Sequence, residues 1–257
     1  MIRSYLKYLF KAQNEHAIHS PFVFDFYVNV LKNQENKVEP STEFIESTRS
    51  TLLSSKQNIN VLDHGAGSRI NKSNTRKVAD VAKNAQKPKQ IAQKLFRIVK
   101  FLQPKTIIDL GTSLGLTTMY FAKAAPNAKI YSFEGCPQTL KMAQKHFDEA
   151  KIENVETVLG NIDESLGMQL QKVSQIDFAF FDANHRYAPT VNYFEQCLAK
   201  SNEKSVFVFD DIHWSAEMEQ AWEYIKSHPK VLITIDLFYI GIVFFRKNQP
   251  KQHFILR

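Results

Sequence analysis

The segment 106–134 constrains the fold more than any other part of this chain, because its sequence has the pattern of one complete βαβ unit. A short apolar strand ends at Asp109, and Gly111 and Gly115 follow in the turn before a helix with apolar residues at helical spacing. A second strand then ends in Glu134. Glycines after a strand let the backbone approach a ligand closely, and an acid at the next strand tip can bind the two hydroxyls of a ribose. The unit therefore predicts a nucleoside-binding site.

Strands and helices continue to alternate after this unit. Further strands are expected at 155–159, 176–181 and 206–209, further helices at 137–150, 189–199 and 216–227, and a pair of strands joined by a tight turn at 231–247. Apolar strands that alternate with helices imply a parallel sheet covered on both faces. We therefore predict an α/β fold, a Rossmann-like doubly wound sheet with a terminal antiparallel hairpin strand.

The preceding part of the chain is expected to be a helical N-terminal extension over residues 1–88, followed by one domain over residues 89–257. Helices are predicted from Pro21, with Ser20 as the cap, and over 41–53 and 89–102. Phenylalanine is frequent in the extension, so it must be buried against the domain or against a second subunit.

Residues 60–70 repeat the pattern of strand, acid and glycine turn around Asp63. A polar, lysine-rich stretch follows, with no second strand and no acid at the right distance. This segment is therefore predicted to be a loop, and two alternatives stay open for it: a lid over the active site or a plain connection.

Composition limits the functional classes. The chain has 257 residues, of which 44% are hydrophobic, enough for a substantial core. No apolar run approaches the ~20 residues that cross a bilayer, no secretory signal is evident, and Cys136 and Cys197 are too few for a disulfide framework. We therefore expect a cytoplasmic protein without a membrane partner. The formal charge of +7 suits an acidic partner such as RNA, but the lysines are spread out.

The glycine spacing distinguishes two kinds of nucleoside ligand. Gly111 and Gly115 form a GxxxG turn, which lacks the GxGxxG glycines that let a helix N-terminus hold a pyrophosphate. The run from Asp109 to Gly115, DLGTSLG, instead resembles the first motif of class I S-adenosylmethionine-dependent methyltransferases. The resemblance implies that Glu134 holds the cofactor ribose. It also implies that the cofactor is lined by Asp109, Gly111, Thr112, Ser113 and Gly115, and that Asn161, or else Asp163, contacts the adenine.

Three further acids end neighbouring strands. Asp182 follows one strand, and Asp210 and Asp211 follow the next. Because the carboxyl ends of parallel strands meet at one edge, these acids converge there and would repel one another without a cation. Hard oxygen ligands indicate Mg²⁺, or else Mn²⁺ or Ca²⁺.

The residues around these acids carry a second resemblance. The runs 181–187, FDANHRY, and 209–211, FDD, resemble the metal-dependent O-methyltransferases related to catechol and caffeoyl-CoA O-methyltransferase. The resemblance implies that Asp182, Asp210 and Asp211 bind a metal, which holds the acceptor hydroxyl and lowers its pKa. Asp182 is accordingly counted as a catalytic and a cofactor-contacting residue as well.

Two departures from that family pattern matter. The family has a lysine base just after the first acid, where this chain has His185 and Arg186, and the last ligand is often Asn where this chain has Asp211. We predict His185 as the general base, since its ordinary pKa lies near ~6.5. The alternatives are that His185 orients Asp182 or binds a substrate phosphate together with Arg186.

The main hypothesis is a methyltransferase that uses S-adenosylmethionine and a divalent metal to methylate a hydroxyl oxygen. One alternative is a metal-independent enzyme of the same fold, in which Asp210 and Asp211 only position the acceptor. A nicotinamide-dependent oxidoreductase is disfavoured by the GxxxG turn, and a non-enzymatic RNA-binding module remains a third alternative. The expected acceptor is a small molecule, with a hydroxylated tRNA base as the second choice, and a homodimer is a further expectation.

Overall fold

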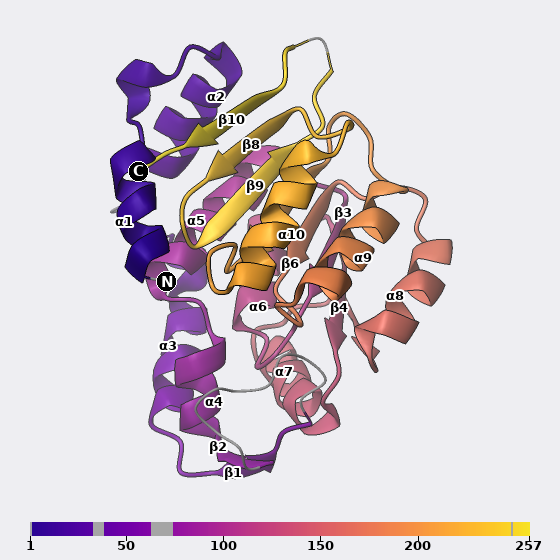
Figure 1. Cartoon of the computed structure of the whole chain (residues 1–257). Coiled ribbons are helices and arrows are strands. Elements are labelled where there is room, and N and C mark those ends of the chain that lie inside the picture. Colours follow the sequence, from indigo (N-terminus) through magenta and orange to yellow (C-terminus); the bar gives the residue numbers. More distant parts are fainter. Residues whose placement is uncertain (1, 33–38, 63–73, 248) are drawn as a thin grey trace.

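The centre of the molecule is an eight-stranded sheet in the order β10-β8-β9-β7-β6-β3-β4-β5 (Figure 1). The computed structural model describes residues 2–32, 39–62, 74–247 and 249–257. The strands are β3 (Thr106–Leu110), β4 (Lys129–Glu134), β5 (Val155–Leu159), β6 (Phe178–Phe181), β7 (Val206–Asp210), β8 (Ile233–Asp236), β9 (Ile240–Phe244) and β10 (Gln252–Ile255). Only β9 runs antiparallel to its neighbours within this sheet, as the partner of β7 and β8. The predicted α/β sheet with an antiparallel hairpin strand is confirmed.

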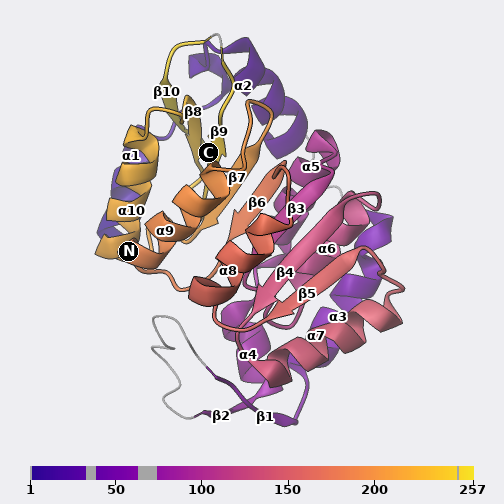
Figure 2. The ribbon, with the colours of Figure 1, turned by 90° about the vertical axis from the view of Figure 1, so that its right-hand side faces the viewer.

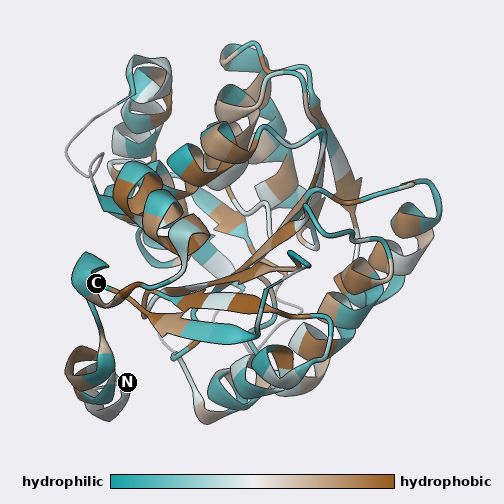
Figure 3. Cartoon of the chain, turned by 90° about the horizontal axis from the view of Figure 1, so that it is seen from above, coloured by the Kyte–Doolittle hydropathy of each residue, from teal (hydrophilic) through white to brown (hydrophobic). Residues whose placement is uncertain are grey.

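Helices cover both faces of the sheet (Figure 2). One face carries α5 (Lys89–Leu102), α6 (Leu116–Ala124) and α7 (Pro137–Glu149), and the other carries α8 (Ile162–Gln171), α9 (Tyr187–Leu198) and α10 (Ala216–Ser227). Strand β6 shows why two helical layers are needed. Successive side chains of a strand point to opposite faces, and every residue of its FAFF run is buried. The hydropathy view from above accordingly shows apolar strands between the two layers (Figure 3).

Two elements of the domain were not predicted from the sequence. Helix α8 begins where the side chain of Asn161 accepts a hydrogen bond from the backbone N of Asp163 at 3.2 Å. Strand β10 lies beyond the hairpin and pairs in parallel with β8, so it adds one more strand at that edge.

The N-terminal extension is buried against the domain, which is the first of the two alternatives expected for it. It comprises α1 (Ile2–Lys11), a 3₁₀ turn (Glu15–Ala17), α2 (Pro21–Phe26) with a π-helical turn (Tyr27–Lys32), a 3₁₀ turn (Pro40–Thr42), α3 (Glu43–Leu53), β1 (Asn58–Asn60), β2 (Thr75–Lys77) and α4 (Val78–Ala85). The predicted cap Ser20 accepts from the backbone N of Val23. The ring of Phe26 packs at 5.2 Å from that of Phe244 in β9 and at 5.8 Å from that of Phe101 in α5. The division at residue 88 stays a prediction.

The extension also reaches the strand edge beside Glu134. In the small β1-β2 sheet, the backbone N of Asn60 donates to the side chain of Gln138 at 2.7 Å, and the Cys136 thiol donates to the Asn60 carbonyl at 3.4 Å. The predicted loop from Asp63 to Arg69 lies outside the described residues. Among the residues that are described, no helix has the length and apolarity to cross a membrane.

Candidate active site

The glycine turn after β3 presses the backbone against the end of β6. Gly111 has φ 116° and Gly115 has φ 85°, a region that favours glycine. A Cβ at position 111 would overlap the carbonyl oxygen of Asp182, and one at position 115 would lie 2.8 Å from the Phe147 ring. Both glycines are therefore required by the turn itself, and Gly111 joins the predicted cofactor residues to the strand-end acids.

Glu134 lies directly beside this turn. Its carboxylate accepts hydrogen bonds from the backbone N of Ser113 and from that of Cys136, both at 2.8 Å. The carboxylate thus bridges the glycine turn and the start of α7, and it remains partly accessible. This is the placement that the ribose interpretation needs, and the ribose contact itself stays a prediction.

Asp109 lies beneath the turn and is fully buried. One of its oxygens, Oδ2, accepts from the hydroxyls of Thr118 at 2.6 Å and Ser132 at 2.7 Å. Burial raises the pKa of Asp109 to about 6, although the two hydroxyls counteract it. Thr112 is also buried, 2.6 Å from the Ser132 hydroxyl. Asp109 and Thr112 therefore support the turn from below.

The predicted adenine residues lie at the start of α8. Asn161 caps that helix, and Asp163 accepts from the hydroxyl of Tyr193 at 2.6 Å. The side-chain amide of Asn184 in turn lies 3.4 Å from the Tyr193 hydroxyl. These polar contacts connect the end of β5 with the loop that follows Asp182.

A lysine that the sequence analysis did not single out lies between the strand-end acids. Lys87, in the short turn between α4 and α5, donates from Nζ to Asp182 Oδ1 at 2.9 Å and also to Asp210 Oδ2. The side chains of Lys87, Asp182 and Asp210 are only 13%, 11% and 3% exposed to solvent. The strand-end carboxylates are therefore already paired with a cation from the N-terminal extension.

His185 and Asp211 complete the surroundings of this ion pair. The Nε2 atom of His185 lies 3.5 Å from Asp182 Oδ1. Asp211 donates its backbone N to the Tyr239 carbonyl at 2.7 Å. The φ angles of Asn184, His185 and Asp211 are 66°, 47° and 54°. Such conformations cost on the order of 1–3 kcal/mol each and cluster at functional sites.

Burial and charge act against each other on the pKa values of this cluster. Burial alone would lower the pKa of Lys87 and of His185, but the neighbouring carboxylates raise both above their ordinary values. At Asp182 the effect of burial is outweighed by Lys87 and His185, so the pKa is lowered. Burial raises the pKa of Asp210 well above its ordinary value despite the nearby Lys87.

The backbone of Lys87 is fixed by a chain of contacts from α3 and α6. Arg49 donates from Nη1 to the Lys87 carbonyl at 2.8 Å and from Nε to Glu46 at 3.2 Å. Glu46 also accepts from the Tyr120 hydroxyl. The position of Lys87 therefore depends on the packing of the extension against the domain.

The residues predicted to bind a metal come together only in part. Asp182, His185 and Asp210 each offer one ligand atom, all within 4.8 Å of one another, whereas Asp211 is not in this group. Carboxylate oxygens suit Mg²⁺, but the Lys87 ammonium is bonded to both carboxylates of the group. A divalent ion would share this space with a charge of the same sign. The described arrangement thus fits an ammonium and does not fit an added divalent ion.

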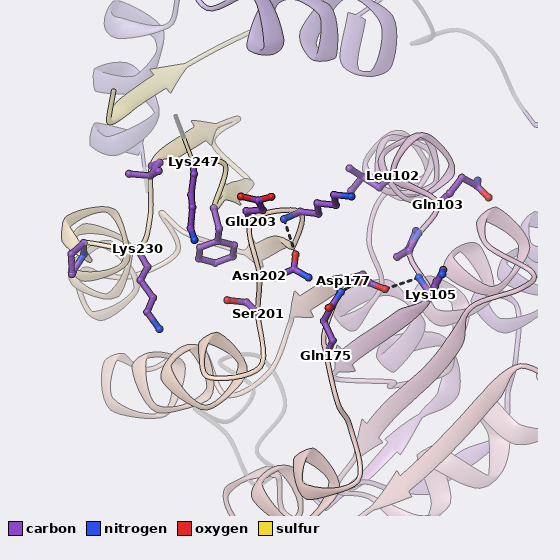
Figure 4. Close-up of a pocket in the computed structure, with 15 residues that line it drawn as sticks. Leu102, Gln103, Lys105, Gln175, Asp177, Ser201, Asn202, Glu203, Lys230 and Lys247 are labelled. Atoms are coloured by element: carbon purple, nitrogen blue, oxygen red, sulfur yellow. Dashed lines mark hydrogen bonds between the residues drawn. The ribbon is translucent and has the colours of Figure 1, made fainter. Parts of the chain in front are cut away.

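A large cavity lies at the amino-terminal ends of the parallel strands, at the opposite end from these residues (Figure 4). Its volume is about 1090 Å³, and its lining residues precede β3, β6, β7 and β8 or follow β9. Lys105, Asp177, Lys230 and Lys247 are among them. Ligands of such sheets bind at the carboxyl ends of the strands, so this cavity is separate from the candidate active site.

Comparison with known proteins finds methyltransferases. Residues 108–212, from β3 to just beyond β7, match a family model described as a methyltransferase domain. This part of the chain is therefore similar to a methyltransferase domain. The catechol O-methyltransferase of Niastella koreensis is 28% identical over 118 residues, which cover 45% of this chain and 52% of that protein. The chain therefore matches about half of the length of this relative.

Solved methyltransferases share the fold. An O-methyltransferase from Bacillus cereus in complex with S-adenosylhomocysteine aligns with a TM-score of 0.58 and 16% identity, over 87% of this chain and 97% of that one. A methyltransferase from Podospora anserina, also bound to S-adenosylhomocysteine, aligns with a TM-score of 0.59 and 12% identity, over 90% and 97%. These likenesses show the fold alone. Together with the family match, they confirm the predicted resemblance to class I methyltransferases.

Proposed function

We propose that this protein transfers the methyl group of S-adenosylmethionine to a hydroxyl oxygen. The observation that carries the proposal is the contact at Gly111, where the glycine turn meets the backbone of Asp182. This contact brings the turn that is predicted to bind the nucleoside beside a cluster of acid, base and ammonium groups, which supports the proposal. The similarity to a catechol O-methyltransferase supports a hydroxyl acceptor.

In the proposed complex, Glu134 binds the ribose, Asn161 or Asp163 faces the adenine, and the glycine turn lies along the methionine part. The acceptor occupies the strand ends of β6 and β7. Its oxygen forms a bond to the methyl carbon while the carbon–sulfur bond breaks, and the bonding pair stays on sulfur as S-adenosylhomocysteine. Holding both reactants in line provides much of the rate enhancement.

The proton of the acceptor hydroxyl passes to His185 in this proposal. Its Nε2 atom lies 3.5 Å from Asp182 Oδ1, so the carboxylate stabilises the imidazolium that forms. Strain at Asn184 and His185 supports a functional role for this loop, because sparsely populated backbone conformations persist where the surroundings enforce them.

The divalent cation predicted from the sequence is untested, and this proposal does not include it. Asp182, His185 and Asp210 are the residues closest to a ligand set. Because Lys87 already pairs with both carboxylates, the metal-independent alternative is favoured, and methyl transfer is proposed without a metal ion. A small-molecule acceptor is proposed, and the tRNA base, the homodimer and the cytoplasmic location remain expectations.

Calorimetry and a transfer assay test the proposal together. The purified protein is titrated with S-adenosylmethionine and, separately, with NAD, and only the former is expected to bind. Methyl-tritiated cofactor is then incubated with a panel of catechols, other phenols and acyl-thioesters bearing phenolic hydroxyls, and with total tRNA. Tight NAD binding without S-adenosylmethionine binding would disprove the assignment. If the tritiated methyl group appears on tRNA and not on any of the phenols, the acceptor is a tRNA base and not a small molecule.

A further inference from the structure

We infer that Lys87 is the resident cation of the acceptor site: its ammonium occupies the position between Asp182 and Asp210 that a divalent ion would take, and it also donates to the acceptor oxygen. The inference rests on the proposed methyl transfer. It concerns which positive charge serves that reaction, and it makes a bound metal unnecessary.

The bonding of Lys87 supports a cation role. An ammonium has three N–H donors and no acceptor. In the described part of the chain two of these donors are directed to Asp182 Oδ1, at 2.9 Å, and to Asp210 Oδ2. In this inference the third donor is the one that bonds to the acceptor oxygen. The acceptor oxygen gains negative charge as its proton leaves, and a positioned ammonium stabilises that charge.

The surroundings show that the pair depends on this lysine. Asp210 is buried at 3% side-chain exposure and Asp182 at 11%, so neither carboxylate is well solvated. A buried charge whose partner is removed is strongly unfavourable. Without Lys87, the two carboxylates would need another cation, and Asp182, His185 and Asp210 are spaced to hold one.

The scaffold fixes the lysine at its backbone. Pro88 follows it and disfavours helical backbone at the preceding residue, and Arg49 donates to the Lys87 carbonyl at 2.8 Å. Arg49 is itself paired with Glu46. These contacts hold the backbone of Lys87 in place just before α5. A lysine that serves as a permanent cation of the site needs such a fixed backbone.

Mn²⁺ binding followed by electron paramagnetic resonance tests the inference without an activity assay. The signal of free Mn²⁺ is titrated with wild-type protein, with Lys87→Met, with Lys87→Arg, and with Lys89→Met as a matched control on an exposed lysine. Wild type, Lys87→Arg and Lys89→Met are expected to bind Mn²⁺ at least about tenfold more weakly than Lys87→Met, a difference of about 1.4 kcal/mol. In Lys87→Met, the additional substitution Asp182→Asn should remove the new site.

Two results would overturn the inference. One is a wild-type protein that binds one Mn²⁺ as tightly as Lys87→Met, with binding lost in Asp182→Asn, because the metal would then displace the lysine. The other is Lys87→Met that keeps the wild-type melting temperature and binds no Mn²⁺. If Lys87→Met does not fold, the wild-type titration decides alone. Calorimetry with S-adenosylmethionine on the same samples separates this outcome from a failure of the proposed function.

Discussion

The two halves of the candidate site are assembled in different ways. In the cofactor half, Ser113 and Glu134 are 21 residues apart in the sequence and belong to one βαβ unit. In the acceptor half, Lys87 meets Asp182 and Asp210 across 95 and 123 residues. The residues of the candidate nucleoside site can therefore be brought together by local chain geometry, whereas those of the candidate acceptor site meet only when the extension packs against the domain.

The two halves also hold their carboxylates differently. Glu134 is bonded by backbone N–H groups, which carry no net charge and are kept in every substitution except one to proline. Asp182 and Asp210 are paired with the side chain of Lys87. Substitutions in the cofactor half should consequently change the affinity for S-adenosylmethionine, while those in the acceptor half should change turnover at nearly constant affinity.

The largest effect is expected for His185→Ala. Loss of a general base typically lowers the rate by ~10²–10⁴-fold, because the hydroxyl proton then has no positioned acceptor. Single-turnover rates with a labelled cofactor measure this, and calorimetry should show unchanged affinity for S-adenosylmethionine. His19→Ala, on an exposed histidine of the extension, is the control. An unchanged rate in His185→Ala would mean that the histidine only orients its loop, and the two halves would then be less distinct than proposed.

Asp109→Asn tests how the cofactor half is supported. The folded-state pKa of Asp109 is raised from 3.8 to about 6, so its ionisation opposes folding. The resulting loss in the free energy of unfolding is absent at low pH and grows as the pH rises from about 4 to 6. It then reaches about 3 kcal/mol, since each pKa unit corresponds to ~1.4 kcal/mol.

The measurement is the free energy of unfolding of wild type and Asp109→Asn at pH 4 and pH 7. The wild type should lose stability relative to the variant between these values, and the exposed Asp148→Asn should show no such relative change. Parallel curves for wild type and Asp109→Asn would show that the buried carboxyl is not destabilising.

Glu134→Ala should weaken S-adenosylmethionine binding. Hydrogen bonds to a charged group contribute roughly 1.5–3 kcal/mol, so the affinity should fall at least about tenfold. Glu134→Gln keeps one acceptor oxygen and should lose less. Glu156→Ala, on the neighbouring strand β5, is the control, since its side chain is 44% exposed and pairs with Lys129. Equal affinity in wild type and Glu134→Ala would remove the ribose assignment.

These differences explain what the sequence could reveal. Asp109, the two glycines and Glu134 follow one another in a pattern whose spacing fixes their placement, so the cofactor half could be located from the sequence. Asp182 and Asp210 were found because parallel strands end at one edge. No sequence pattern distinguishes Lys87, which is one of 33 Lys and Arg residues and lies in a turn before a helix. Its burial in the site, in contrast to the exposed Lys89, results from tertiary packing alone.

The sequence led to a metal hypothesis because converging acids need a cation. The resemblance to metal-dependent enzymes indicated that this cation is a divalent metal. The chain supplies its own positive charge from a segment that shares no motif with the strand ends. The need for a balancing charge at this site was thus predictable from the sequence, whereas the contribution of Lys87 to it was not.

The smallest effect is expected for Arg49→Met, which tests whether the extension positions Lys87. The substitution removes the 2.8 Å hydrogen bond to the Lys87 carbonyl and the pairing with Glu46. Hydrogen bonds with a charged group contribute about 1.5–3 kcal/mol when fully buried, and Arg49 is partly exposed, so about 1 kcal/mol of stability should be lost. Because the Lys87 side chain can still reach its partners, turnover should fall by less than about tenfold. Affinity for S-adenosylmethionine should not change, and Ser50→Ala on the exposed side of the same helix is the control. If turnover is unaffected while stability falls, Arg49 only braces α3, and Lys87 is held by its ion pairs alone.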